Sequence, residues 1–171
     1  DLRVAAEGSG AVFEPNPVYT LRDGALRDDQ DRDSAALTGA RVVVKLERLS
    51  GSGYFLKGTW ADVTPTKQAT SSAASDWTGV TRSERAFEQV MCYYHVDAAQ
   101  QRLQDLGIRN VNADAQKIDA HALTQDQSYY DRYDDTLRFG DGGVDDAEDA
   151  DIIRHEYGHA IQYAQVGDWG V

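Results

Sequence analysis

The sequence predicts an α+β fold, in which a curved, mostly antiparallel sheet is backed by two long helices. Three observations predict it: apolar and polar residues alternate from Arg41 onward, and two stretches, over residues 81–106 and 145–166, carry apolar residues at helical spacing. Hydrophobic residues make up 41% of the 171 residues, enough to bury a core. We therefore expect an irregular N-terminal arm over residues 1–40 and a folded unit over 41–171.

The N-terminal arm mixes Gly, Pro, Asp and Arg without a sustained period, which favours irregular backbone. Within it Asp29, Asp31 and Asp33 imitate the start of a calcium loop. Ser34 and Ala40, however, stand where such a loop requires glycine and glutamate. We interpret this segment as a solvated acidic turn.

The first strand is predicted after Arg41, where Val42, Val44 and Leu46 fall on one face of a half-buried strand. Residues 50–53 are Ser-Gly-Ser-Gly, which supplies turn residues, and alternation resumes over 54–60. This pattern predicts a β-hairpin.

The first long helix is predicted to follow Thr81, whose hydroxyl can cap it while Glu84 reaches back in a capping box. Gly107 is a suitable stop. The apolar stripe that should pack on the sheet consists of Phe87, Val90, Met91, Tyr94, Ala98 and Leu106.

Further strands are expected over 118–122, 128–130 and 136–139, before a glycine-rich break at 140–143. A second helix then begins near Asp145 or Asp146, where carboxylates favour the positive end of a helix dipole, and ends before Gly167.

The second helix carries His155-Glu156-Tyr157-Gly158-His159, which matches the HExxH pattern. Residues four apart lie on one helix face, so both imidazoles can reach one ion. Zinc suits imidazole nitrogen, and a catalytic site leaves one position for a water whose pKa the metal lowers. We therefore expect His155 and His159 to bind zinc and Glu156 to accept the proton. The alternative is a chance match on a solvated helix.

The chain resembles the thermolysin-like gluzincin peptidases and, more loosely, the bacterial relatives of the fungalysins. The resemblance is carried by Thr-Leu-Arg-Phe-Gly-Asp-Gly-Gly at 136–143, by the acidic stretch and Asp-Ile-Ile-Arg at 151–154, and by the HExxH motif. Residues 86–106, with Tyr93-Tyr94-His95, are similar to the long helix that precedes these elements. The resemblance implies the N-terminal, zinc-binding lobe of a secreted endopeptidase that cleaves peptide bonds with a zinc-activated water.

The resemblance also implies a substrate-binding edge strand, whose place is taken by Gln127, Ser128 and Tyr129. Backbone pairing with an extended peptide is expected there, although the usual Asn is missing; for the tyrosines, ordinary sheet packing is the alternative. Asp151 matches the position of a structural calcium ligand, with partners expected from later sequence. The remaining histidines, His95 and His121, are interpreted as core or surface residues because neither falls at motif spacing.

The third zinc ligand is not predicted within this chain. Gln162 and Gln165 stand where metzincins have Gly and His, which excludes that class. Gluzincins take a Glu about twenty residues after the second histidine, to complete three protein ligands. That position lies beyond Val171, so we expect a missing C-terminal lobe to supply the ligand and the isolated chain to be inactive.

The net charge of the chain restricts the kinds of partner that it can bind. With 29 acidic and 17 basic residues, a net charge of -12 opposes binding to nucleic acid or to an anionic membrane. No apolar run is long enough to span a bilayer, and the start lacks the pattern of a signal peptide. Two alternatives stay open: a non-catalytic module that uses the HExxH helix to bind a metal or a partner, and an acidic calcium-dependent adhesion fragment.

Overall fold

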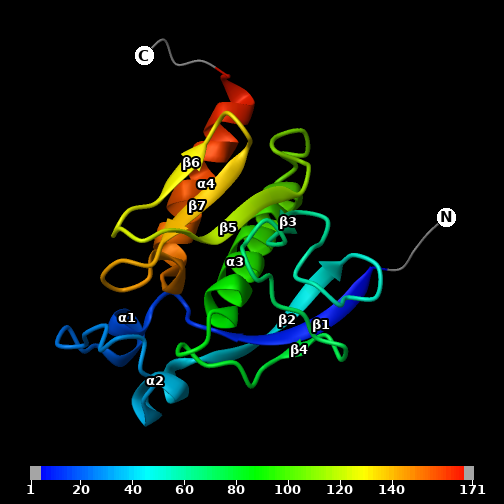
Figure 1. Cartoon of the computed structure of the whole chain (residues 1–171). Coiled ribbons are helices and arrows are strands. Elements are labelled where there is room, and N and C mark those ends of the chain that lie inside the picture. Colours follow the sequence, from blue (N-terminus) through cyan, green and yellow to red (C-terminus); the bar gives the residue numbers. More distant parts are fainter. Residues whose placement is uncertain (1–4, 168–171) are drawn as a thin grey trace.

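The computed structural model describes residues 5–167, which form a mixed α+β fold with two mixed sheets and four helices (Figure 1). No helix in this described part is long and apolar enough to cross a bilayer. In chain order the elements are β1 (Ala6–Val12), α1 (Pro17–Leu21), α2 (Ala35–Ala40), β2 (Val42–Leu49), β3 (Ala61–Asp62), β4 (Asp76–Trp77), α3 (Ala86–Asp105), β5 (Gln116–Leu123), β6 (Tyr129–Asp131), β7 (Thr136–Gly140), a 3-10 turn (Asp146–Glu148) and α4 (Ala150–Gln165).

The three-stranded sheet has the order β2-β1-β4, with β1 antiparallel to β2 and parallel to β4. The prediction of an irregular arm is therefore wrong for β1, which is the central strand. Its sequence, AEGSGAV, hides this because the glycines interrupt the apolar alternation. Gly10 is required by packing: a Cβ there would lie 2.7 Å from Cγ1 of Val90 on α3.

The four-stranded sheet has the order β3-β5-β7-β6. Strand β5 runs parallel to β3 and β7, and only β6 is antiparallel to its neighbour. The predicted mostly antiparallel sheet is thus corrected to two mixed sheets. The predicted hairpin is also wrong, because β2 pairs with β1 and meets the following segment only at the isolated bridge of Leu49 with Gly58. Alternation shows which face of a strand is buried, but not which strand lies beside it.

The long helix α3 lies at the centre of the molecule and packs against strands of both sheets and against α4 (Figure 1). Phe87, Val90 and Met91 of the predicted apolar stripe are fully buried. Leu106 is not part of it, because this residue follows the helix and is 57% exposed. The capping residues differ from expectation. Glu84 does accept from the backbone N–H of Thr81, at 3.1 Å, but this closes a turn ahead of α3, which begins only at Ala86.

Helix α4 contains the HExxH motif and follows the 3-10 turn. The side chain of Asp149 caps it by accepting from the backbone N–H of Asp151. One face of α4 is buried through Ile153, Tyr157 and Ala160. The expected helix is therefore present, but it starts after the acidic residues that were predicted to begin it.

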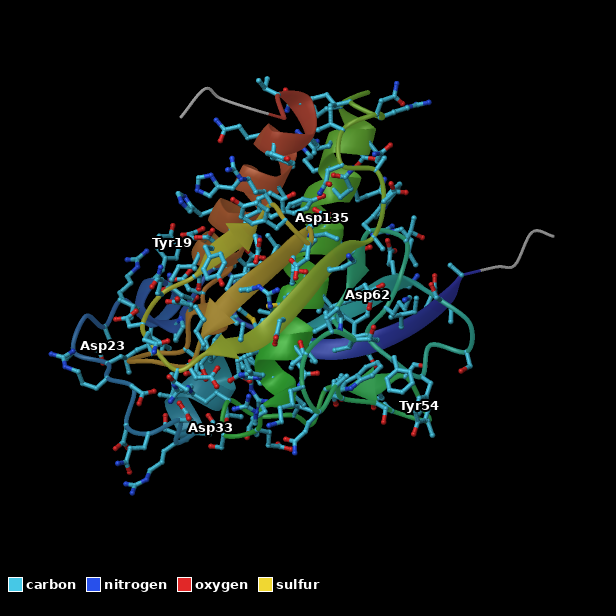
Figure 2. All side chains as sticks on the ribbon, turned by 45° about the horizontal axis from the view of Figure 1, so that its top comes forward. Tyr19, Asp23, Asp33, Tyr54, Asp62 and Asp135 are labelled. Carbon is cyan, nitrogen blue, oxygen red and sulfur yellow. The ribbon has the colours of Figure 1, made fainter. Side chains whose placement is uncertain are left out.

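The acidic segment between α1 and α2 forms no calcium loop. Figure 2 shows Asp23 and Asp33 at the edge of the molecule, on the segment that joins these two helices. The carboxylate of Asp33 accepts from the Thr38 hydroxyl at 2.7 Å, and Asp31 lies 3.9 Å from Arg82. Within residues 5–167, the single group of three or more side chains placed to hold a metal contains none of these aspartates.

Candidate metal centre

His155 and His159 lie on consecutive turns of α4, with both side chains exposed on the same face. Their Nε2 atoms are 3.1 Å apart, and the ring planes are nearly perpendicular, at 86°, with centroids 4.8 Å apart. The spacing of four residues thus brings two ring nitrogens to one point, as the sequence predicts.

The spacing of these nitrogens suits zinc. Two ligands at the usual Zn–N distance and a tetrahedral angle would be about 3.3 Å apart. The two Nε2 atoms are at 3.1 Å, so chelation requires only a small adjustment. The same geometry allows one ring to donate a hydrogen bond to the other, and metal titration separates the two cases.

Glu156 lies between the two histidines in sequence and, unlike them, is buried, with 8% of its surface exposed. Burial raises its pKa, and the charges of His159 and His155 and the backbone N–H of Tyr130 oppose that rise. A carboxylate with a raised pKa beside two imidazoles is suited to accept and later return a proton.

A cleft of about 480 Å³ opens over this face of α4, and the edge strand β6 forms its other side. Ser128 and Tyr129 line it, whereas Gln127 is exposed and does not. The hydroxyl of Ser128 donates to the carboxylate of Asp146, which ties the start of β6 to the turn before α4. Two of the three predicted substrate-binding residues therefore lie at the cleft.

The glycine-rich segment positions this edge strand. A Cβ on Gly140 would lie 2.0 Å from the carbonyl oxygen of Gln125, and one on Gly142 would lie 2.3 Å from the backbone nitrogen of Asp126. The loop that leads into β6 therefore lies directly against the glycines, an approach that a side chain would block. The sequence indicated a break here, and the structure shows a close contact between two loops.

Asp151, predicted as a calcium ligand, is exposed on α4 and lies 3.8 Å from the guanidinium of Arg154. No metal-ligating group within residues 5–167 includes it. His95 is a core residue, as interpreted from its sequence position. Its Nε2–H donates to the carbonyl of Phe13 at 3.0 Å, and burial together with the charge of Arg154 lowers its pKa to about 3.

The side chain of His121 is buried, which agrees with its interpretation as a core residue, and it also lies beside two carboxylates. It forms a cluster with Asp141 and Asp145, in which each side chain offers one potential metal-ligating atom and these three atoms lie within 4.8 Å of one another. This is the only such cluster among residues 5–167. Sequence reasoning missed it because the members come from β5, from the end of β7 and from the loop before α4. The parallel pairing of β5 with β7, had it been predicted, would have brought the first two together.

No third ligand joins His155 and His159 from the part of the chain that the structure describes. The ligand expected from a following segment stays a prediction. Comparison with known proteins adds no family assignment: no family model matches the sequence, and no curated protein matches it either.

Proposed function

We propose that this chain is the zinc-binding part of a zinc-dependent endopeptidase, with His155 and His159 as ligands and Glu156 as the catalytic base. The observation that carries the proposal is the pair of Nε2 atoms 3.1 Å apart, with a buried carboxylate next to them in the same cleft. Zinc, when bound, supplies a Lewis acid that polarises a carbonyl and makes water a stronger acid.

Glu156 does the proton transfer in this proposal. It lines the cleft beside both histidines, so it can take a proton from the attacking water and pass it to the leaving amine. Burial raises its pKa, which strengthens it as a base. A second carboxylate is not required for this role.

The edge strand β6 is proposed to align the substrate. It pairs with β7 on one side only, from Tyr129 opposite Arg138 to Asp131 opposite Thr136. The other edge lies at the cleft and can pair with an extended peptide. This proposal needs only the backbone, so the missing Asn does not affect it.

The third zinc ligand is proposed to be a glutamate from a C-terminal lobe, and secretion is proposed from the family resemblance alone. A specific observation favours the alternative of a non-catalytic metal-binding or partner-binding module: both histidines are exposed, and residues 5–167 offer them no third ligand. The experiment must therefore separate metal binding from catalysis.

The test titrates zinc into the purified chain by calorimetry and assays a quenched fluorescent peptide, with and without any downstream segment that the gene encodes. We expect weak zinc binding and no cleavage by the chain alone, and cleavage when the segment is added. The matched control is the double variant His155→Ala with His159→Ala, which should lose the zinc that binds on α4 and should not cleave the peptide in either arm. Cleavage by the chain alone that is lost in Glu156→Gln would mean that an acid within this chain completes the site. Zinc binding without cleavage in either arm would favour the non-catalytic module.

A further inference from the structure

A second cluster of metal-ligating side chains lies away from α4, where β5 and β7 end beside the start of α3. His121 belongs to β5, Asp141 follows β7, and Asp145 precedes the turn before α4. Their ligand atoms lie within 4.8 Å of one another. The side chain of His121 is almost fully buried, at 1% exposure.

Both ring nitrogens of His121 face oxygen atoms that accept hydrogen bonds, although a neutral imidazole carries only one N–H. Its Nε2 lies 2.9 Å from the carbonyl oxygen of Arg85, which can only accept, so Nε2 carries a hydrogen. Its Nδ1 lies 2.7 Å from Oδ1 of Asp141, and a carboxylate oxygen also only accepts. This close pair is therefore either bridged by a second proton, as its distance allows, or held by a cation that binds both atoms from one side.

An unpartnered carboxylate next to the ring points to the cation. The side chain of Glu88 is 2% exposed, its Oε2 has no hydrogen-bond partner, and this atom lies 3.6 Å from Nε2 of His121. A buried carboxylate without a partner costs considerable free energy. Glu88 therefore either takes up a proton, which burial favours by raising its pKa, or is offset by a positive charge nearby.

The arginines near the cluster do not supply enough charge. Arg85 pairs with Asp141 at 3.0 Å but is half exposed. Arg82 is engaged by Glu148 and Asp28. In the part of the chain that the structure describes, no hydrogen bond or ion pair involves the carboxylate of Asp145, although this residue is buried.

We propose that His121, through Nδ1, together with Asp141 and Asp145, binds a divalent cation whose charge also offsets Glu88. An imidazole among carboxylates suits Mn²⁺ or Zn²⁺, whereas Ca²⁺ takes oxygen ligands only. The hydrogen bond from Nε2 to the carbonyl of Arg85 is the support that metal-ligating histidines generally have. The cation would tie β5, β7 and the approach to α4 together, so its role is structural and independent of the HExxH site.

The test uses the full chain carrying His155→Ala and His159→Ala, so that the pair on α4 cannot contribute. Mn²⁺ and Zn²⁺ are titrated by calorimetry, and the thermal unfolding midpoint is measured with and without each metal. We expect one equivalent to bind and the midpoint to rise, with Ca²⁺ binding more weakly. Asp145→Asn should weaken binding by at least about tenfold. Asp114→Asn, which removes an exposed acid beyond the other end of α3, should leave it unchanged.

Ring-nitrogen NMR of His121 distinguishes the cation from a second proton. We expect bound Zn²⁺ to remove the Nδ1 proton and to leave the Nε2 proton in place. A doubly protonated ring that persists in excess metal would overturn the proposal in favour of a buried imidazolium. Saturable binding that is equally tight in Asp145→Asn and Asp141→Asn, or no binding at all, would overturn it as well. Circular dichroism confirms that each variant is folded before titration.

Discussion

The hydroxyl of Tyr157 on α4 donates a buried hydrogen bond of 2.6 Å to Oε1 of Gln100 on α3. Each residue turns an α-helix by about 100°, so Tyr157 faces away from both His155 and His159. The middle of the HExxH motif thus anchors α4 to the central helix, while its ends present the two imidazoles to the cleft.

Tyr157→Phe should destabilise the fold without changing the shape of the cleft. The variant leaves Oε1 of the buried Gln100 without a donor, which costs about 1–3 kcal/mol. Urea unfolding measures the free energy. The control is Tyr133→Phe, on a tyrosine that is 87% exposed, where the change should stay within about 0.5 kcal/mol. Equal stability of both variants would show that the α3–α4 hydrogen bond is dispensable.

His155→Ala and His159→Ala should each weaken zinc binding on α4 by at least about a hundredfold, because loss of even a supporting residue commonly costs ten- to a hundredfold. Both variants also carry Asp145→Asn, so that the second cluster does not contribute. Gln162→Ala, which removes another cleft-lining side chain of α4, should leave the affinity unchanged. Calorimetry in the presence of a competing chelator measures the difference. An unchanged affinity in either histidine variant would assign zinc to another site.

Arg82→Met should be among the most destabilising single changes. Arg82 and Glu148 form a buried pair, each side chain 3% exposed, with Nε 2.9 Å from Oε1. Removal of one partner from such a pair commonly costs about 3–5 kcal/mol, because the other charge stays buried.

The matched control is Arg32→Met, whose pair with Asp29 is two-thirds exposed and 3.8 Å long, and which should cost under about 1 kcal/mol. Urea unfolding of both variants gives the comparison. If Arg82→Met also lowers the free energy of unfolding by less than about 1 kcal/mol, the buried carboxylate of Glu148 is tolerated without its ion-pair partner.

Stability should fall as the pH drops below about 6.5, partly because of His95. Burial and Arg154 lower its pKa from 6.5 to about 3, so between these values the unfolded chain binds the extra proton and the folded chain does not. The contribution of His95 to the free energy of unfolding is therefore complete above pH 6.5. Below pH 6.5 this contribution declines by up to about 1.4 kcal/mol per pH unit.

His95→Gln tests this, because its amide can still donate to the carbonyl of Phe13 but does not titrate. Urea unfolding between pH 5 and pH 7 should show a flatter dependence for the variant than for the parent protein. The difference between the two curves isolates His95 from the carboxylates, which titrate in both. Parallel curves would show that His95 takes up its proton as readily in the folded chain as in the unfolded chain.

Strands β2, β5 and β7 and helix α4 could be predicted because their own residues carry a period. The predicted stripe of α3 captured only part of its buried surface, because this central helix is buried on more than one face. Strand β1 could not be predicted, since glycines such as Gly10 serve contact with α3 and erase the alternation. The direction of pairing between β5 and β7 was also hidden, because it depends on which elements cross between the strands rather than on either strand alone.

The two candidate metal sites also differ in whether a local sequence pattern could predict them. His155 and His159 were found because one helix sets their geometry, so a spacing of four residues is sufficient. His121, Asp141 and Asp145 lie on separate elements, and only tertiary packing brings them together. Glu88 carries no sequence signal, because what marks it is burial without a partner.

The most direct test of the central claim is metal content and peptide cleavage measured on the same preparation of the protein, together with any downstream segment that its gene encodes, and of its Glu156→Gln variant. The account predicts equal zinc content, because Glu156 is not a ligand, and a rate reduced by about 10²- to 10⁴-fold, because proton transfer is lost. Loss of zinc together with activity would contradict the assigned role, and full activity in Glu156→Gln would contradict the mechanism.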